Sequence, residues 1–190
     1  MCLQETKWVG KKAKELDSSG FKLWYTDEVR SRNGVGIIVD KEWKKDIVDV
    51  KRIGDRIIAL KFVVEQNTFN VISAYAPPQV GLEEHLKVKF WEELEGLIQD
   101  IPLGEKIFLG GDLNGHVGSV SRGFEGVHGG YGLGELNAEG NSILDISSAF
   151  DLTIANTCFR KRDEHLITYK SGASCSQIDF FLIRKTRRSV

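Results

Sequence analysis

The sequence predicts an α/β protein in which two β-sheets pack between helices. Three observations lead to this prediction: apolar and polar residues alternate over much of residues 21–75, a helical repeat follows, and short apolar runs separated by glycine make up the rest. The chain has 190 residues, of which 41% are hydrophobic and 28% charged, an ordinary globular composition. A chain of this length buries about 70% of its unfolded surface, enough for one core. We therefore expect a single domain that spans residues 1–190.

Predicted strands dominate the first part of the chain. The start at Cys2-Leu3-Gln4-Glu5 has no polar or capping residue before it and resembles the middle of a strand. The Asn33-Gly34 pair predicts a tight turn. The alternation is typical of an antiparallel meander with one buried face. Further strands are predicted over residues 21–25, 36–39, 46–51, 55–64 and 68–75.

A helix and a glycine-rich segment follow the meander. An amphipathic helix of about five turns is predicted by apolar residues at four- and three-residue steps, namely Leu82, Leu86, Phe90, Leu94 and Leu97. Eleven of the twenty glycines lie in residues 110–140, where we expect a long functional loop with no core. A second helix is predicted over residues 142–150, and strands over 106–109, 152–155, 166–169 and 177–183.

Composition excludes several classes of protein. The three cysteines, Cys2, Cys158 and Cys175, are far apart with no CxxC spacing, which argues against a disulfide framework and a structural zinc site. They favour a reducing, intracellular compartment. No apolar run reaches the roughly 18 residues of a membrane span. The net charge of −1 does not mark a nucleic-acid binder, although basic runs occur at 41–45, 160–162 and 184–188. Each run is either a solvated face or a phosphate contact.

Polar side chains recur where the predicted strands end. Glu5 follows the first strand, Tyr75 closes the meander, and Asp112 and Asn114 come directly after a short apolar strand. Asp179 lies inside the apolar last strand. Ligand and catalytic groups often gather on such strand-end loops. Singly, each residue also has an ordinary structural interpretation, as a solvent-facing residue or as part of an Asx turn.

Together these residue types are typical of phosphodiester hydrolysis assisted by a hard metal ion. The reaction needs its negative charge stabilised and a water molecule activated, and Mg²⁺ or Mn²⁺ does both. Because Mg²⁺ prefers one or two carboxylates, Glu5 suits the role of metal ligand. Asp112 suits water activation or a second metal contact, Asn114 can orient a phosphate oxygen or the water, and Tyr75 can donate a hydrogen bond to phosphate. We expect these residues and Asp179 to converge on one cation.

Short motifs along the chain resemble a known superfamily. The motifs are Gln4-Glu5-Thr6, Asn33-Gly34-Val35-Gly36, Tyr75-Ala76-Pro77, Gly111-Asp112-Leu113-Asn114 and Ser176-Gln177-Ile178-Asp179. Their order resembles that of the endonuclease/exonuclease/phosphatase superfamily, which includes deoxyribonuclease-I-like enzymes and abasic-site endonucleases. Asn156-Thr157-Cys158-Phe159 and Thr168-Tyr169 also resemble the endonuclease domains of LINE-type retrotransposons and chains like craniofacial development protein 2.

The resemblance implies a fold and roles for individual residues. The implied fold is a four-layer sandwich of two mixed, mostly antiparallel β-sheets flanked by helices. Glu5 would be the metal ligand, Asp112 and Asn114 the central catalytic pair, and Tyr75 the residue that stabilises phosphate. Asp179 would orient a catalytic histidine. The family also has an Asn on a first strand and a final Asp-His pair that this sequence does not contain. We therefore expect a domain that lacks its first and last strands and has little activity by itself.

None of the four histidines matches the family's catalytic position. They are His85, His116, His128 and His165, and all precede Asp179. We interpret them as neutral core or surface residues. A substitute catalytic role for His116 or His128, which lie in the glycine-rich segment, is the alternative.

Three functions fit the sequence. The first is a metal-dependent DNA endonuclease of retroelement type, with the basic tail at 184–188 on DNA phosphates and the protein in the nucleus. The second is a phosphatase of the same fold that acts on lipid or nucleotide phosphates, since a fold does not decide its substrate. The third is a non-catalytic remnant that binds a partner. The retroelement-like motifs favour the first, and the oligomeric state stays open.

Overall fold

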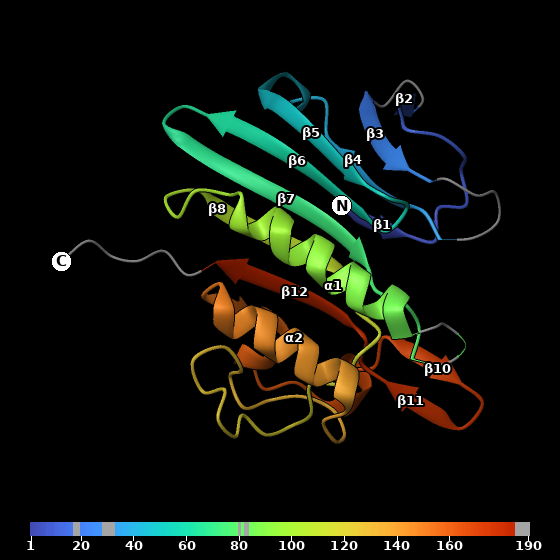
Figure 1. The fold of residues 1–190 in the computed structure, drawn as a ribbon, viewed down its shortest axis with the longest axis vertical. Helices are drawn as coiled ribbons and strands as arrows, with labels where there is room; N and C mark the ends of the chain where they lie inside the picture. Colours follow the sequence, from blue (N-terminus) through green and yellow to red (C-terminus); the bar gives the residue numbers. More distant parts are fainter. Residues whose placement is uncertain (17–19, 28–32, 80, 82–83, 185–190) are drawn as a thin grey trace. The chain divides into compact units, whose positions relative to one another are not determined.

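The computed structural model describes residues 1–16, 20–27, 33–79, 81 and 84–184, and Figure 1 shows the course of the chain. The chain forms two compact units. The first unit comprises Met1–Ala76 and Ile101–Gly111, and the second comprises Pro77–Asp100 and Asp112–Val190. That both units belong to one domain stays a prediction.

The first unit contains two runs of hydrogen-bonded strands. One is an antiparallel sheet in the order β1-β4-β3-β2. Its strands are β1 (Cys2–Gln4), β2 (Lys12–Leu16), β3 (Phe21–Thr26) and β4 (Val35–Val39). The other follows the chain in the order β5-β6-β7-β8. Its strands are β5 (Ile47–Ile53, after the 3₁₀ turn Lys44–Asp46), β6 (Ile57–Val64), β7 (Asn67–Tyr75) and β8 (Lys106–Asp112).

The core of the first unit lies between these two groups of strands. Because strand side chains alternate between faces, every second residue of β4 and β6 points into it. Strand β4 packs on β6 and β7. The buried cluster consists of Trp24, Val35, Ile37, Val39, Ile58, Leu60 and Phe62. The antiparallel pairing of β5 with β6 and of β6 with β7 confirms the predicted meander. The expectation of a single buried face was wrong for β6, in which the successive residues Ile57, Ile58, Ala59 and Leu60 are all buried.

The second unit contains both helices and two strand pairs. Helix α1 (Glu84–Gln99) and helix α2 (Ala138–Ala149) lie side by side (Figure 1) and together line a shallow hollow. Strand β9 (Leu152–Ile154) pairs antiparallel with β12 (Asp179–Arg184). Strands β10 (Tyr169–Ser171) and β11 (Ser174–Ser176) form a hairpin, and short 3₁₀ turns cover Ala155–Cys158 and Asp163–His165. Within the described ranges, no helix has the length and apolar character needed to cross a membrane.

Several details differ from the sequence-based expectations. Leu86 was expected on the buried face of α1 but is 38% exposed, and the buried stripe begins at Phe90. Leu82 lies outside the described residues. The strand expected over 166–169 was wrong, because Leu166 follows a 3₁₀ turn and only Tyr169 begins a strand. Strand β2 was missed because the charged residues of this edge strand are exposed on both faces, which removes the apolar alternation.

The expectation that the basic tail at 184–188 contacts DNA phosphates was wrong for its first residue, Arg184. Arg184 is buried, and its Nη2 donates to the Ile98 carbonyl in α1 at 3.3 Å, so it does not present its charge to DNA phosphates. The remaining tail residues, 185–188, lie outside the described residues. Of the other basic runs, 41–45 contains Lys44, whose Nζ lies 2.9 Å from Glu15 Oε2.

The glycine-rich segment contains a small core, contrary to expectation. Val117 and Val127 are buried in it. Backbone bridges join Val117 to Leu136 and His128 to Ile154 of β9, so the segment folds back on itself and onto a strand. Glycine removes side-chain volume but does not prevent the remaining apolar residues from packing. The expectation that no core forms here was therefore wrong.

His128 is the central polar residue of this segment and is almost fully buried. Its Nε2 lies 3.2 Å from the Gly118 carbonyl, and its Nδ1 accepts from the Gly130 amide at 3.0 Å. One neutral tautomer, with hydrogen on Nε2, satisfies both contacts. This geometry agrees with the interpretation of His128 as a neutral core histidine. Burial lowers its pKa below the ordinary value, although the hydrogen bond to Gly118 opposes the shift.

Replacing Gly111 with alanine should destabilise the fold. A Cβ at this position would lie 1.9 Å from the Ala74 carbonyl oxygen of β7, and backbone cannot move away cheaply. We expect Gly111→Ala to lower the free energy of unfolding by about 1–3 kcal/mol, as overpacking does. Gly96→Ala is the control, because a Cβ there meets nothing within 4 Å in helix α1, and it should raise stability by about 1 kcal/mol. Urea unfolding measures both, and an unchanged midpoint for Gly111→Ala would contradict the close approach.

Acid should destabilise the protein through His128. Because its folded pKa is lowered, the unfolded chain takes up a proton more readily, and the stabilisation by neutral His128 is complete only above the unfolded pKa of about 6.5. We expect the free energy of unfolding to fall as pH drops from about 6.5 through the folded pKa. Urea unfolding at several pH values should show a smaller loss in His128→Gln than in the parent chain. His165→Gln, at an exposed position, should retain the full loss; equal pH dependence in all three chains would exclude His128 as the cause.

Candidate functional site

Glu5 and Tyr75 form the first group of candidate residues, in the first unit. Glu5 follows β1 and Tyr75 is the last residue of β7. The Tyr75 hydroxyl donates to Glu5 Oε1 at 2.9 Å, and Lys7 Nζ lies 3.5 Å from Oε2. The Glu5 side chain is 52% exposed, so the carboxylate is both oriented and open to solvent.

Arg56 supports this group, and sequence reasoning did not identify it. Its guanidinium carbon lies 5.0 Å from the centre of the Tyr75 ring, and its Nη1 donates to the Tyr75 carbonyl at 3.1 Å. Its Nη2 donates to Asn33 Oδ1 at 2.8 Å. Burial lowers the pKa of Arg56, and the nearby Asp55 charge opposes the shift. Nothing in the sequence separates Arg56 from the other basic residues, because its contacts lie about 20 positions away.

Asp112 and Asn114 form the second group, in the second unit. Asp112 is the last residue of β8, and its Oδ1 accepts from the Asn114 amide at 3.0 Å, an Asx turn. Asn114 has a φ of +48°, in the left-handed region that non-glycine residues seldom adopt. The Asn114 carbonyl accepts from Gln79 Nε2 at 2.9 Å. Asn114 is therefore held at both its amide and its carbonyl. The ordinary Asx-turn interpretation is confirmed, and a functional role stays a prediction.

A chain of polar contacts holds Gln79 in turn. Its carbonyl accepts from Lys87 Nζ at 3.0 Å, and the same ammonium lies 3.0 Å from Glu139 Oε1. The hydrogen bond to Glu139 raises the pKa of Lys87. Burial would raise the pKa of Glu139, but the hydrogen bond and charge of Lys87 outweigh it and hold the pKa below its ordinary value. Helix α1 and the start of α2 thus share a charged pair, and this pair positions Gln79, which donates to the Asn114 carbonyl.

Asp179 lies beside the Asp112 turn through the backbone. The Leu113 amide, next to Asp112, donates to the Ile178 carbonyl at 2.8 Å. The amides of Ile178 and Asp179 both donate to Thr168 Oγ1, at 3.0 and 3.2 Å. Asp179 begins strand β12 and its side chain is half-buried. The structure thus brings Asp112, Asn114 and Asp179 into one neighbourhood of the second unit.

Asn156 and Thr168 also have a clear place in this neighbourhood. Asn156 Oδ1 accepts from the Phe181 amide at 2.7 Å, and its Nδ2 donates to the Asp179 carbonyl at 3.4 Å. Together with Thr168 it holds the backbone on both sides of the candidate carboxylate. The retroelement-like motifs that contain these two residues therefore include the supports of Asp179.

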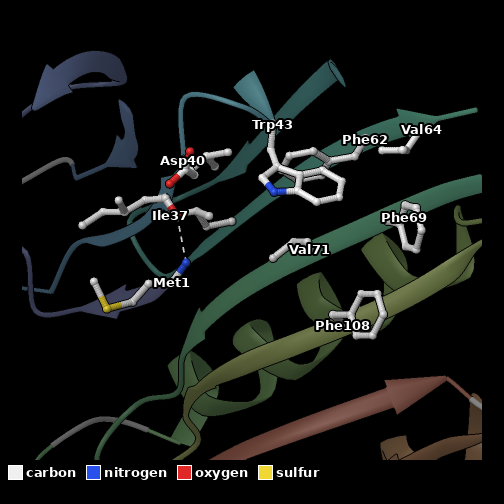
Figure 2. Close-up of a pocket in the computed structure, with 11 residues that line it drawn as sticks. Met1, Ile37, Asp40, Trp43, Phe62, Val64, Phe69, Val71 and Phe108 are labelled. Atoms are coloured by element: carbon white, nitrogen blue, oxygen red, sulfur yellow. Dashed lines mark hydrogen bonds between the residues drawn. The ribbon is translucent and has the colours of Figure 1, made fainter. Parts of the chain in front are cut away.

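A hollow in the first unit has a lining unsuited to phosphate ester cleavage. It has a volume of about 350 Å³, and Figure 2 shows Met1, Trp43, Phe62 and Phe108 around it. Apart from the Met1 amino group, Asp40 is the one titratable group among its lining residues. Phosphate ester cleavage needs several converging polar groups, so we do not assign the reaction to this hollow.

Comparison with known proteins identifies relatives by sequence. No family model matches the chain. It is 33% identical over 190 residues to craniofacial development protein 2 of Tragulus javanicus and 32% identical to that of Bos taurus. These matches cover 98% of the chain but only 32% and 31% of the two relatives. The chain thus spans about a third of their length.

Solved structures show the fold. An abasic-site endonuclease from Archaeoglobus fulgidus superposes with a TM-score of 0.67 at 19% identity, covering 96% of this chain and 74% of that one. The 3′ phosphatase NExo from Neisseria, bound to a product DNA hairpin, gives 0.62 at 16% identity, with 96% and 75% covered. The endonuclease domain of TRAS1, a telomere-specific non-LTR retrotransposon, gives 0.57 at 15% identity, with 86% and 64% covered. The expected fold class is confirmed: the chain has the α/β sandwich fold of endonuclease/exonuclease/phosphatase proteins and is similar over its whole length to part of craniofacial development protein 2.

Proposed function

We propose that this chain is a phosphodiester hydrolase domain, most specifically a Mg²⁺-dependent DNA endonuclease of retroelement type. The observation that carries the proposal is the fixed turn in which Asp112 holds Asn114, with Asp179 on the adjoining backbone. A carboxylate and an amide held rigidly at a strand end can orient a water molecule and a phosphate oxygen without reorganising during the reaction.

Each residue then has a distinct task in one proposed reaction. Asp112 accepts a proton from the attacking water as the water oxygen bonds to phosphorus, and Asn114 orients the water or a phosphate oxygen. One P–O ester bond breaks, and its leaving oxygen takes a proton from solvent. Tyr75 donates a hydrogen bond from its hydroxyl to the phosphate. Glu5 in the first unit and Asp112 in the second are each proposed as a metal ligand. When bound, Mg²⁺ supplies Lewis acidity and a more acidic water molecule.

The donor atoms suit a hard cation such as Mg²⁺ or Mn²⁺. Glu5 offers a half-exposed carboxylate that a solvated ion can reach. Among the residues that the structure describes, no three His, Cys, Asp or Glu side chains form a cluster that could enclose a metal ion. Mg²⁺ does not require such a cluster, because it keeps several waters and binds through one or two carboxylates.

DNA is the proposed substrate because of what similar proteins act on. The Neisseria protein was determined with a product DNA hairpin, and the TRAS1 domain is an endonuclease of a retrotransposon. Action on chromosomal DNA would require entry to the nucleus, so a nuclear location depends on this proposal. A second candidate is removal of a terminal phosphate, since the Neisseria protein is described as a 3′ phosphatase.

Asp112→Ala should abolish DNA cleavage. We expect the rate of supercoiled-plasmid nicking in Mg²⁺ to fall by about 10²-fold or more, the usual effect of removing a general base. Because the chain spans about a third of its relatives, the assay should use this chain and a longer version from the same reading frame. Asp145→Ala, at an exposed carboxylate of α2, is the matched control and should nick at the parent rate.

The same assay separates the candidate functions. No nicking by either version, together with release of phosphate from a 3′-phosphorylated DNA end, would replace the endonuclease with a terminal phosphatase. Turnover of lipid phosphates alone would overturn a DNA substrate. Equal nicking by Asp112→Ala and the parent would remove Asp112 from the mechanism.

Tyr75→Phe should show whether the Tyr75 hydroxyl orients Glu5 or acts on the phosphate alone. The hydroxyl donates to Glu5 in this structure, so its loss should weaken the orientation of a proposed metal ligand. We expect the Mg²⁺ concentration for half-maximal activity to rise about 10-fold or more, as when a ligand loses its supporting hydrogen bond. Titration of Mg²⁺ in the nicking assay measures this concentration. A lower maximal rate with unchanged Mg²⁺ dependence would show instead that Tyr75 acts on the phosphate alone.

A further inference from the structure

A tryptophan stands on the surface three residues after the candidate metal ligand Glu5. Trp8 is 48% exposed and the adjoining Val9 is 50% exposed. The Trp8 and Tyr25 rings meet in an edge-to-face arrangement, with centroids 5.8 Å apart and planes at 68°, so Trp8 is anchored by Tyr25 while about half of the residue stays exposed. A half-exposed aromatic ring of this size can serve as a stacking platform for a nucleobase.

The loop that carries Trp8 is strained and tightly held. Lys7 has a φ of +57° and Glu5 one of +50°, a left-handed conformation that costs free energy for non-glycine residues. Reciprocal backbone hydrogen bonds join Gly10 and Asp27 at 3.0 and 3.3 Å. A chain that merely crossed the surface would need neither the strain nor these bonds, so the position of Trp8 is specified by its surroundings.

Lysines flank the exposed ring in the sequence, and one of them, Lys7, has its Nζ 3.5 Å from Glu5 Oε2. Residues 7–14 read Lys-Trp-Val-Gly-Lys-Lys-Ala-Lys and contain no acidic residue, although the whole chain has a net charge of −1. In β2, Lys12 pairs with Tyr25 and Lys14 with Leu23, so both lysines share the sheet face on which Trp8 meets Tyr25. A solvated lysine face alone does not account for a half-exposed tryptophan anchored on Tyr25 beside these lysines.

The ring and the lysines border a hollow of suitable size. It has a volume of about 460 Å³ and is lined by Lys7, Trp8, Val9, Lys14, Leu16 and Tyr25. Binding sites for small ligands commonly have about 300–1,000 Å³. The lining combines aromatic and aliphatic surface with ammonium groups, which matches a nucleotide with its apolar base and anionic phosphate.

We propose that Trp8 stacks on an unpaired nucleotide of DNA, while Lys12 and Lys14 contact the phosphates beside it. The surface would thus select DNA that has a single-stranded or frayed segment next to the site of cleavage. This inference rests on the proposed function, since it concerns DNA held near Glu5. The binding itself does not require hydrolysis and is measured separately from it.

The test compares two fluorescein-labelled DNA probes, a blunt duplex and the same duplex with a short single-stranded extension. Fluorescence anisotropy in EDTA measures binding without cleavage. We expect the chain to prefer the extended probe, and Trp8→Ala to weaken that binding by about 5- to 100-fold, the effect of losing one stacked base. Affinity for the blunt duplex should stay nearly constant.

Matched variants separate stacking from general damage to the fold. Trp43→Ala is the control, because Trp43 is 49% exposed in the same unit but borders the apolar hollow of Figure 2, and it should bind both probes like the parent. Trp8→Phe keeps a ring and should keep most of the affinity, whereas Trp8→Leu keeps apolar bulk without a ring and should not. The double variant Lys12→Gln, Lys14→Gln should bind with a weaker salt dependence. The slope of the logarithm of the binding constant against the logarithm of the salt concentration should fall by about 0.7 per lost phosphate contact.

Each outcome either supports the inference or overturns it. Equal affinity of Trp8→Leu and Trp8→Phe for the extended probe, or no preference for that probe in the parent chain, would overturn it. So would an acidic peptide that competes as well as single-stranded DNA. If the parent nicks plasmid but shows no such preference, the proposed function stands and this inference fails. If the preference depends on Trp8 but no DNA is cleaved, the inference stands and the proposed function fails.

Discussion

The hydrogen bond from the Leu113 amide to the Ile178 carbonyl is the contact on which the candidate site depends. It joins the end of β8 to the start of β12 across a long stretch of chain and sets Asp112 beside Asp179. Both backbones are then fixed from other directions, one by Gln79 and the other by Thr168. Asp112 ends β8 and Asp179 begins β12, so this bond links the strand ends that carry the two carboxylates. With it, they form one rigid neighbourhood, as positioned catalytic groups require.

Backbone strain marks both groups of candidate residues. Asn114 in one unit and Glu5 in the other occupy the left-handed region, although neither is glycine. Such conformations persist only where surrounding contacts compensate for their cost. The compensation for Asn114 is its Asx turn and the bond from Gln79, which the Lys87–Glu139 pair supports. The second unit therefore couples the packing of its helices to the geometry of one turn.

The sequence predicted most strands from their apolar residues bounded by turns, as in β6, where the successive residues Ile57, Ile58, Ala59 and Leu60 are buried. It failed where that pattern is absent: β2 is exposed on both faces, and β10 and β11 are only three residues long. The pairing of Asp112 with Asn114 follows from local turn chemistry and was predictable. The contributions of Gln79 and Arg56 were not, because each acts on a residue that folding alone brings near. The roles of all the candidate residues in catalysis stay predictions.

The most direct test of the account is where a paramagnetic cation binds. Mn²⁺ titrated into nitrogen-15-labelled protein broadens the amide signals of residues close to it. We expect the signals of the proposed metal ligands Glu5 and Asp112, and of Asn114 and Asp179 beside Asp112, to broaden at the lowest Mn²⁺ concentrations. Asp112→Ala should remove the effect at Asn114 and Asp179. Sharp signals at these residues, with broadening first at an exposed carboxylate such as Asp49, would contradict the account.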